Sequence, residues 1–442
     1  MTEQHKTNQA PFAKIVQVSA TARTQLRQGA SLNSVIRPVL QQLPPESRPT
    51  AQAIIYESVR KTALCRFILS KLCKNKPSQE VESLLEASLA ALFLRRYTEF
   101  TIVSETVNAA KTSPITRQAA GFVNAILRRF LREKDSLLQE AKKNVEIRFN
   151  APAWWIARIR TAYPEEANRI LELGTKHPPM ILRINRRKTT MEDYLLTLSA
   201  NHLNAKRVGP DAVLLHSPLP VEMVPGFSQG IVSVQDAGTQ LAAHLLEVTN
   251  DSRVLDACSA PGGKTAHLLE RYNCQMTALE IDKHRTEKVR ETLKRLNLHA
   301  DVKTADASHI SDWWDGKPFD YILLDAPCTA SGVVRRQPDT PWLRRAGDIT
   351  SLATEQHRLL TTLWPLLKNG GRMLYATCSI FPEEGTKQIE RFLTETTDAE
   401  LIPIAGQKML TLLPEENDSW DSHSPIPSVH DGFFYALLQK RG

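Results

Sequence analysis

The chain has 442 residues, of which 42% are hydrophobic and 24% are charged, and its formal net charge is +8. This composition is typical of a globular protein with enough chain for two or three domains. The six cysteines show no repeated spacing, CxxC pair or Cys/His cluster, so we expect neither a disulfide framework nor a metal site. No signal peptide or membrane span is predicted, because residues 1–15 lack an apolar core and the apolar stretch 84–94 is short and contains Glu86. The expected location is therefore the cytoplasm.

The positive charge is concentrated in the first third of the chain. Residues 1–150 contain 10 Lys and 13 Arg against 12 Asp and Glu, a net charge of +11, so the remainder carries −3. Such a basic region predicts a polyanionic partner whose binding weakens as salt rises. A solvated helical surface is the alternative interpretation.

Residues 10–140 show apolar residues at helical spacing. We expect the last of these helices to start at Ser113, as the cap, and Pro114, as the first helical residue. Its apolar residues cover one half of the helix, and the other half presents four arginines that could face RNA or merely be solvated. These candidate RNA-binding residues are Arg117, Arg128, Arg129 and Arg132.

The remaining chain changes pattern twice. Residues 143–230 predict a helical connector followed by strand, helix and strand, as in a small α+β module with an RRM-like arrangement. From residue 231 onward, strands alternate with helices, which predicts a doubly wound, mostly parallel sheet of Rossmann type. The predicted domains are thus 1–142, all helical, then 143–230 and 231–442.

The loop "DACSAPGGKT" follows the first strand of this last domain, where doubly wound sheets bind cofactors. It resembles a phosphate-binding loop only in part, because Cys258 stands where the first glycine is required. The GxGxxG pattern of dinucleotide sites is also absent. The third interpretation is a loop that binds a nucleoside cofactor without a pyrophosphate. Acidic residues at successive strand ends could bind the hydroxyls and the base of such a cofactor: Asp256, Glu280 and Asp306.

Two cysteines, Cys328 and Cys378, each follow the end of an apolar strand. In the 3-2-1-4-5 strand order these two strands are neighbours, about 4.8 Å apart, so both thiols should meet beside Asp325 and the cofactor. Two thiols and a carboxylate suggest covalent catalysis on an electrophilic ring. Buried structural cysteines or a disulfide switch are the alternatives, and the residues alone do not indicate which thiol attacks.

Three motifs, "DACSAPGGKT", "LLDAPCTASGVVRRQPDTPW" and "YATCSIFPEE", resemble those of the RNA (cytosine-5)-methyltransferases that use S-adenosylmethionine. The segment "AAGFVNAILRRF" is similar to the NusB-like domain that precedes the catalytic domain in the branch acting on 16S rRNA. The resemblance covers most of the chain. It implies a methyltransferase fold preceded by a NusB-like domain, and a substrate that is 16S rRNA or a small-subunit assembly intermediate.

The resemblance also implies roles for individual residues. Cys378 would be the nucleophile, Cys328 would assist product release, and Asp325 would lie between cofactor and base. Glu280 would bind the ribose and Asp306 would face the adenine. The methionine part would be held by Cys258, Ser259, Ala260, Pro261, Gly262, Gly263 and Lys264.

The long segment after Cys328 is expected to line the base pocket, where Arg335 and Arg336 could hold phosphates. We expect a monomer without a metal ion. Two alternatives stay open: the same chemistry on tRNA, and a non-catalytic rRNA-binding assembly factor.

Overall fold

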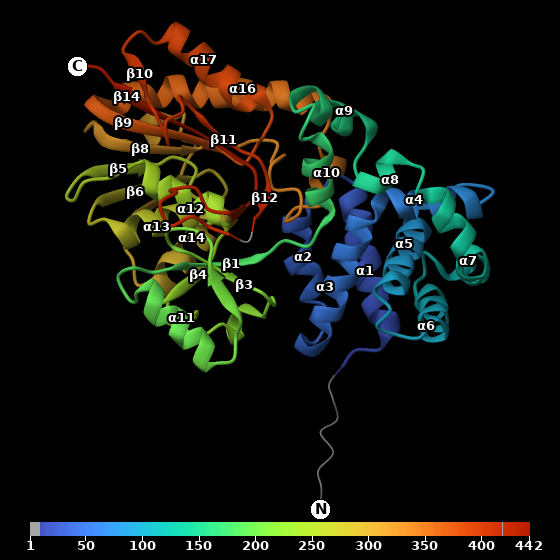
Figure 1. Ribbon diagram of the computed structural model, residues 1–442. Coiled ribbons are helices and arrows are strands. Elements are labelled where there is room, and N and C mark those ends of the chain that lie inside the picture. The colour runs from blue at the N-terminus through green and yellow to red at the C-terminus, as the bar shows by residue number, and fades with distance from the viewer. Residues whose placement is uncertain (1–8, 418) are drawn as a thin grey trace, which may run out of the picture. The chain divides into compact units, whose positions relative to one another are not determined.

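The computed structural model describes residues 9–417 and 419–442 and divides into two compact units. Unit 1 contains the described chain up to Lys176 together with Val334–Arg345, and unit 2 contains His177–Val333 and Ala346–Gly442 (Figure 1). Among the described helices, none combines the length and the apolar character needed to cross a bilayer.

Unit 1 is built from helices, and the described helices α1 to α7 pack around one apolar core. The N-terminal caps are polar side chains where the sequence supplies them, as at Ser31, Ser78 and Thr98. Its elements are α1 (Phe12–Arg27), α2 (Leu32–Leu40), η1 (Pro45–Ser47), α3 (Arg48–Arg60), α4 (Thr62–Leu72), α5 (Gln79–Leu94), α6 (Glu99–Thr112), η2 (Arg117–Ala119), α7 (Ala120–Ala141), α8 (Val145–Phe149), α9 (Ala153–Ala162), α10 (Ala167–Thr175) and α15 (Thr340–Leu343).

The start of α7 differs from the sequence prediction. Ser113 is the C-cap of α6, and α7 begins only at Ala120, after the short 3-10 turn η2. A serine followed by proline can end one helix as well as begin the next, because the residue before proline is pushed out of the helical region. The predicted helix exists, but its first turn lies several residues later.

The segment Val334–Arg345 follows Cys328 closely in the sequence, but it belongs to unit 1, whereas Cys328 belongs to unit 2. There the Asp339 carboxylate accepts a hydrogen bond from the Leu32 amide at the start of α2 (2.8 Å). The Arg60 guanidinium donates to the Arg335 carbonyl (2.9 Å). The segment's tryptophan, Trp342, lies under the Arg66 guanidinium at 4.7 Å, so it already has a stacking partner within the protein.

The first part of unit 2 is a small α+β module, as the sequence predicts. Its antiparallel sheet has the order β2-β3-β1-β4, and α11 connects β1 to β2. The elements are β1 (Met180–Ile184), α11 (Met191–Ala200), β2 (Ala205–Arg207), β3 (Ala212–Leu215), η3 (Val221–Met223) and β4 (Val232–Val234).

The second sheet of unit 2 is the predicted doubly wound sheet. Its seven-strand path has the order β10-β14-β9-β8-β5-β6-β7, and β11 pairs with β14 as an eighth strand. Strands β5 to β9 are parallel neighbours, whereas β14 runs antiparallel to β9. The strands are β5 (Arg253–Asp256), β6 (Gln275–Glu280), β7 (Asp301–Thr304), β8 (Phe319–Asp325), β9 (Leu367–Thr377), β10 (Ala399–Ile402), β11 (Leu410–Leu412) and β14 (Phe433–Lys440), with the separate pair β12 (Glu415–Glu416) and β13 (Val429–His430).

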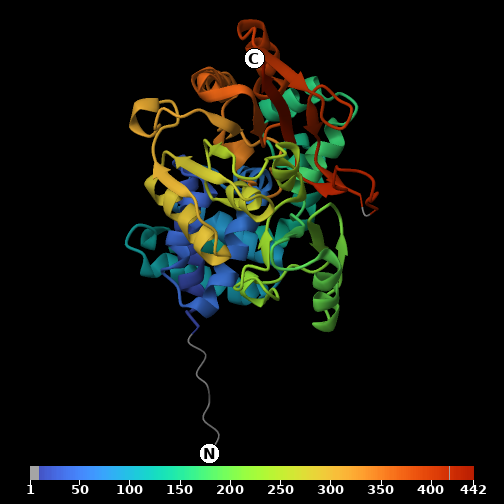
Figure 2. The ribbon, with the colours of Figure 1, turned by 90° about the vertical axis from the view of Figure 1, so that its left-hand side faces the viewer.

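Helices cover both faces of this sheet (Figure 1). Successive residues of β8 point to opposite sides, so Leu323 packs in the core beneath α12, α13 and α14, whereas Ile322 and Leu324 pack beneath α16 and α17. Figure 2 shows α16 and α17, in orange and red, at the opposite end of unit 2 from the green helix α11. The helical elements are α12 (Ala237–Leu245), α13 (Gly263–Arg271), α14 (Lys283–Leu296), η4 (Ile310–Asp312), α16 (Ala346–Leu363), η5 (Trp364–Leu366), η6 (Pro382–Glu384) and α17 (Thr386–Glu395).

Candidate active site

The carboxyl ends of the parallel strands bring the sequence-predicted residues to one edge of the sheet. Asp256 is the last residue of β5, Glu280 of β6 and Asp325 of β8. Because parallel strands end at the same edge, residues far apart in sequence become neighbours there. This edge is the candidate active site.

The loop between β5 and α13 is fixed by its backbone. Both the amide and the hydroxyl of Ser259 donate to the Leu279 carbonyl, at 2.8 and 2.9 Å. Gly262 has a φ of +95°, and a Cβ there would lie 3.2 Å from Cα of Val289 on α14. Glycine is therefore required at 262, both for the left-handed backbone and for the close approach of α14.

The acidic residues that follow offer oxygens for a nucleoside. Glu280 is 3% exposed, and its Oε1 accepts from the Asp282 amide (3.1 Å) while facing Arg285 (3.4 Å). Within the described residues its Oε2 has no hydrogen bond, so it can accept from a ribose hydroxyl. Asp306, after β7, accepts from the amide and the hydroxyl of Ser308 through Oδ1, at 2.8 and 2.7 Å.

Asp256 lies beneath the loop and is fully buried. Its Oδ2 accepts from the Thr265 hydroxyl (2.6 Å), whereas its Oδ1 is buried without a hydrogen-bond partner. Burial raises the pKa of Asp256 to about 7, although the Thr265 bond opposes the shift. Asp256 thus supports the loop from below through its bond to Thr265.

Lys264 and Asp325 form an ion pair at this edge, with 2.6 Å between Nζ and Oδ2. Burial lowers the pKa of Lys264, but the Asp325 carboxylate outweighs burial and the net direction is upward, so the side chain stays an ammonium. The Cys378 sulfur also acts on Lys264 electrostatically. The sequence singles out Lys264 only as part of the cofactor loop, and no pattern in the sequence indicates its pairing with Asp325.

The two cysteines lie side by side, with 3.3 Å between Cys328 Sγ and Cys378 Sγ. This confirms the predicted adjacency, which follows from the parallel pairing of β8 with β9. Cys328 is buried and Cys378 is partly exposed. The hydrogen bond with Cys378 and burial together raise the pKa of Cys328 well above the ordinary thiol value, so the Cys328 thiol stays protonated.

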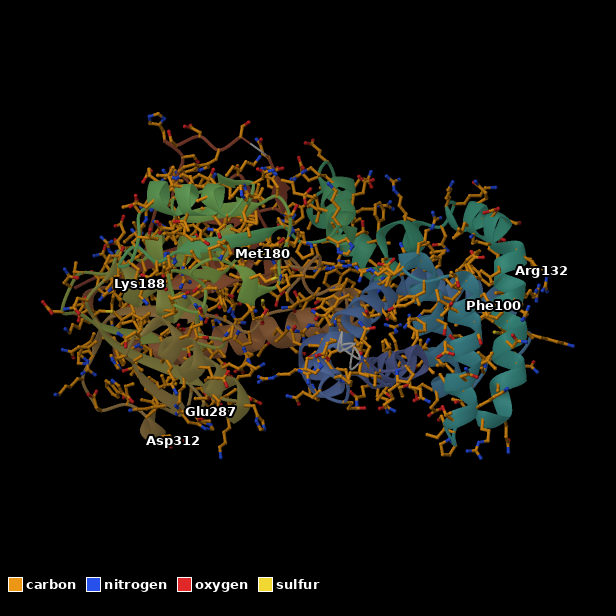
Figure 3. The ribbon with its side chains drawn as sticks, turned by 90° about the horizontal axis from the view of Figure 1, so that it is seen from below. Phe100, Arg132, Met180, Lys188, Glu287 and Asp312 are labelled. Atoms are coloured by element: carbon orange, nitrogen blue, oxygen red, sulfur yellow. The ribbon has the colours of Figure 1, made fainter. Side chains whose placement is uncertain are left out.

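The predicted arginines fall into two groups. Arg117, Arg128, Arg129 and Arg132 are exposed on unit 1, where Figure 3 labels Arg132 on α7. Three of them also form hydrogen bonds to nearby residues in the chain: Arg117 to the Lys111 carbonyl, Arg128 to Asn124, and Arg129 to Glu133. Arg129 donates a further bond to the Leu72 carbonyl at the end of α4.

The loop arginines differ from the prediction. The Arg335 side chain is only 2% exposed, and the Arg336 side chain is partly exposed. A guanidinium that is closed off from solvent does not reach a phosphate in this conformation. The expectation that Arg335 holds a phosphate is therefore corrected. The sequence shows two adjacent arginines in a polar segment and gives no sign that the segment is held by unit 1.

The structure adds one cluster that the sequence does not indicate. The ligand atoms of Asp211, His244 and His267 lie within 4.8 Å of one another, as in a metal site. However, Arg186 and Arg271 also contact the Asp211 carboxylate, at 2.6 and 3.0 Å, and these two cations disfavour a third. The cluster joins the module, through Asp211, to helices α12 and α13.

Comparison with known proteins covers nearly the whole chain. Ribosomal RNA small subunit methyltransferase B of Pseudomonas syringae pv. tomato is 40% identical over 419 residues, 93% of each chain. The protein of the same name from Photorhabdus laumondii is 38% identical over 424 residues, 94% of this chain and 96% of its own.

The chain belongs to the 16S rRNA methyltransferase RsmB/F family. The model for this family matches residues 243–439, a model for the RsmF/B-like ferredoxin-like domain matches 151–222, and the NusB family model matches 5–132. The predicted family and fold class are thereby confirmed, including the NusB-like part and the small α+β module.

Solved structures agree with this fold. The crystal structure of PH0851 aligns with a TM-score of 0.79 at 22% identity, over 97% of this chain and 99% of its own. A methyltransferase homolog protein from Pyrococcus horikoshii aligns at 0.56 and 27% identity, over 67% of this chain and 97% of its own.

Proposed function

We propose that this RsmB/F family member transfers a methyl group from S-adenosylmethionine to C5 of a specific cytosine in 16S rRNA through a covalent adduct with Cys378. The observation that carries the proposal is the 3.3 Å approach of the Cys328 and Cys378 sulfurs at the edge where Lys264 pairs with Asp325. An rRNA substrate is consistent with the cytoplasmic location that the sequence predicts.

The cofactor site is assigned to residues at the ends of β5, β6 and β7. The loop Cys258–Lys264 holds the methionine part, Glu280 accepts from the ribose, and Asp306 faces the adenine. The fixed Gly262 turn and the unbonded Glu280 Oε2 support this assignment. S-adenosylmethionine, when bound, supplies a methyl group on a sulfonium.

The nucleophile assignment rests on differences between the two thiols. Cys378 is the more exposed of the two, and its sulfur interacts electrostatically with the Lys264 ammonium. Its sulfur bonds to C6 of the cytosine, and C5 becomes electron-rich enough to take the methyl group. The Asp325 carboxylate, held by Lys264, accepts a hydrogen bond from the N4 amino group of the base and orients the ring for attack.

Cys328 acts in the second half of the reaction. After methyl transfer a base must take the C5 proton, so that the electron pair of the C5–H bond restores the C5–C6 double bond while the Cys378 sulfur leaves C6 with the electrons of the C–S bond. Cys328 assists this release from its position next to that sulfur. The target base must first be unstacked, which costs a few kcal/mol in a duplex and less in a loop.

The partner is 16S rRNA, free or in a small-subunit assembly intermediate, bound by a monomer. The exposed arginines of α7 and its preceding turn support phosphate contacts by unit 1: Arg117, Arg128, Arg129 and Arg132.

A trapping experiment tests the cysteine roles. Cys328→Ala should accumulate protein covalently attached to RNA, because the adduct forms but is released slowly, whereas Cys378→Ala should show neither adduct nor methyl transfer. Cys274→Ala removes a thiol that precedes β6, far along the strand from the candidate site, and should behave as wild type. Denaturing gels of reactions with 16S rRNA measure the adduct. Unchanged methyl transfer in Cys378→Ala would contradict the proposal.

The position of the methyl group needs its own measurement. 16S rRNA and tRNA should be incubated separately with the enzyme and cofactor and then sequenced after bisulfite treatment. We expect one new 5-methylcytosine in 16S rRNA and none in tRNA. Methylation of tRNA alone would leave the chemistry intact and overturn the substrate.

A further inference from the structure

A buried carboxylate lies next to both cysteine loops without being part of the proposed chemistry. Glu384 ends the 3-10 turn η6, six residues after Cys378, and its side chain has 0% exposure. A buried glutamate is costly unless its oxygens are fully hydrogen-bonded. Its bonding partners therefore indicate what it does.

The two oxygens of Glu384 together receive four hydrogen bonds. Oε1 accepts from the Thr329 amide (2.8 Å) and from Gln356 Nε2 (3.1 Å). Oε2 accepts from the hydroxyls of Thr329 (2.5 Å) and Ser379 (2.6 Å). Thr329 directly follows Cys328, and Ser379 directly follows Cys378. One carboxylate thus bonds to the neighbour of each thiol.

Further bonds tie the same two loops together. The hydroxyls of Ser331 and Ser379 lie 2.8 Å apart, and the Ile380 amide donates to the Ser331 hydroxyl (2.9 Å). Gln356 on α16 also donates to the Pro327 carbonyl (2.9 Å), just before Cys328. The Glu384 backbone is held in turn, since its carbonyl accepts from Tyr375 Oη (2.9 Å).

We propose that Glu384 is a positioning residue that sets the distance between the Cys328 and Cys378 sulfurs by clamping both cysteine loops with a single carboxylate. The inference rests on the proposed function, because it concerns the geometry of the two thiols that perform it. The hydrogen bonds of Glu384 go to Thr329, Ser379 and Gln356, through which it positions the two loops, and its carboxylate also acts electrostatically on Cys328.

The reach and the charge of glutamate can be changed separately. Aspartate keeps the charge, but its shorter side chain cannot span Thr329, Ser379 and Gln356 at once. Glutamine keeps the reach, and the Thr329 and Ser379 hydroxyls can rotate to accept from its amide nitrogen. The two substitutions therefore separate reach from charge, and reach should matter more for the distance between the sulfurs.

The distance between the sulfurs can be probed chemically. Diamide oxidises two neighbouring thiols to a disulfide, taking up their two electrons and two protons. In wild type, with the sulfurs 3.3 Å apart, this intramolecular bond should form readily. Glu384→Asp and Glu384→Ala should slow its formation about tenfold or more and Glu384→Gln less, as measured by mass spectrometry of the peptides. Glu390→Gln, an exposed glutamate on α17, is the matched control.

Kinetics supply a readout that general destabilisation would not produce. Because a misplacement of about 1 Å can cost about 10²-fold in rate, kcat of Glu384→Asp should fall by about that factor. KM for S-adenosylmethionine should stay unchanged, since Glu384 has no bond to the cofactor loop. Unchanged cofactor binding also shows that the variant is folded. If Glu384→Ala does not fold, Thr329→Val and Ser379→Ala remove the clamp's hydroxyls one at a time and should each give a smaller loss in kcat.

The outcomes separate this inference from the proposed function. If Cys328→Ala with Glu384 intact accumulates no RNA adduct, the proposed function fails. If that adduct forms, but Glu384→Asp keeps wild-type kcat and a wild-type disulfide rate, the positioning role is overturned. A parallel loss of kcat and of cofactor binding in every clamp variant would also overturn it, because it would indicate a merely structural residue.

Discussion

The carboxyl edge of the large sheet and the arginine face of α7 are both polar, but they are built differently. At the edge, Lys264, Asp325 and Glu384 are wholly or largely buried, and each has a partner that comes from a different strand or loop. On α7, Arg128 and Arg132 are exposed, and the bond of Arg128 is to Asn124 one turn away. Long-range, buried bonds fix the position of a group, whereas local bonds on a surface leave it free to move.

This difference determines what a substitution should change. At the edge, a substitution alters groups that are held in place for chemistry, so rates and local stability should respond. On the arginine face, a substitution removes charge from a solvated side chain, so only binding to a polyanion should respond. Three experiments test this contrast.

The largest effect is expected at Lys264. Lys264→Met removes the ammonium that pairs with Asp325 and interacts electrostatically with Cys378, so kcat should fall by about 10²-fold or more. Single-turnover methyl transfer to 16S rRNA measures the change. Lys288→Met, an exposed lysine on α14, is the control and should keep wild-type activity. Equal activities of the two variants would remove Lys264 from the mechanism.

A smaller effect is expected from Gly332→Ala. A Cβ at 332 would lie 2.2 Å from the Gly432 carbonyl oxygen, so one of the two backbones must shift. The Gly332 amide also donates to the Cys378 carbonyl (2.9 Å), and that bond should be strained. We expect about 1–3 kcal/mol less stability, measured by thermal unfolding of the full chain, together with a lower kcat.

The matched control for this substitution is Gly347→Ala on α16, where an added Cβ meets no atom within 4 Å. That variant should match wild type or be slightly more stable, because alanine favours a helix over glycine. If both glycine variants behave alike, the close approach at Gly332 does not constrain the site.

The smallest effect on the enzyme itself is expected on α7. The double substitution Arg128→Ala and Arg132→Ala should leave the melting temperature and the rate at saturating RNA unchanged. It should weaken 16S rRNA binding and lower the salt dependence of affinity by about one unit of slope per lost phosphate contact. Arg391→Ala on α17, where Arg391 pairs with Glu395, is the control. Unchanged affinity at low salt would leave the face as a solvated surface.

The sequence predicts the site to the extent that topology determines it. Strand-helix alternation gives the strand order, and the strand order gives the adjacency of Cys328 and Cys378. The acidic residues are found for the same reason, since each ends or follows a strand. The short strands β2, β4 and β10 to β13 are not predicted, because two to four residues carry too little periodicity.

Sequence patterns do not predict which side chains of distant loops bond to one another. The motif "FPEE" offers Glu383 and Glu384 equally, and only the fold shows that Glu384 is the buried one. The burial of Arg335 is missed similarly, because it depends on Val334–Arg345 belonging to unit 1. Composition and motif spacing describe a residue's own surroundings in the chain, not its tertiary partners.

Because Val334–Arg345 belongs to unit 1, the design of chimeras between members of this family is affected. The chain crosses between the units three times, after Lys176, after Val333 and after Arg345. A single cut after residue 176 would strip this twelve-residue stretch of Leu32, Arg60 and Arg66, its hydrogen-bonding and stacking partners. A chimera that takes its helical part from a relative should therefore import the matching loop as well, so that the graft carries three junctions instead of one.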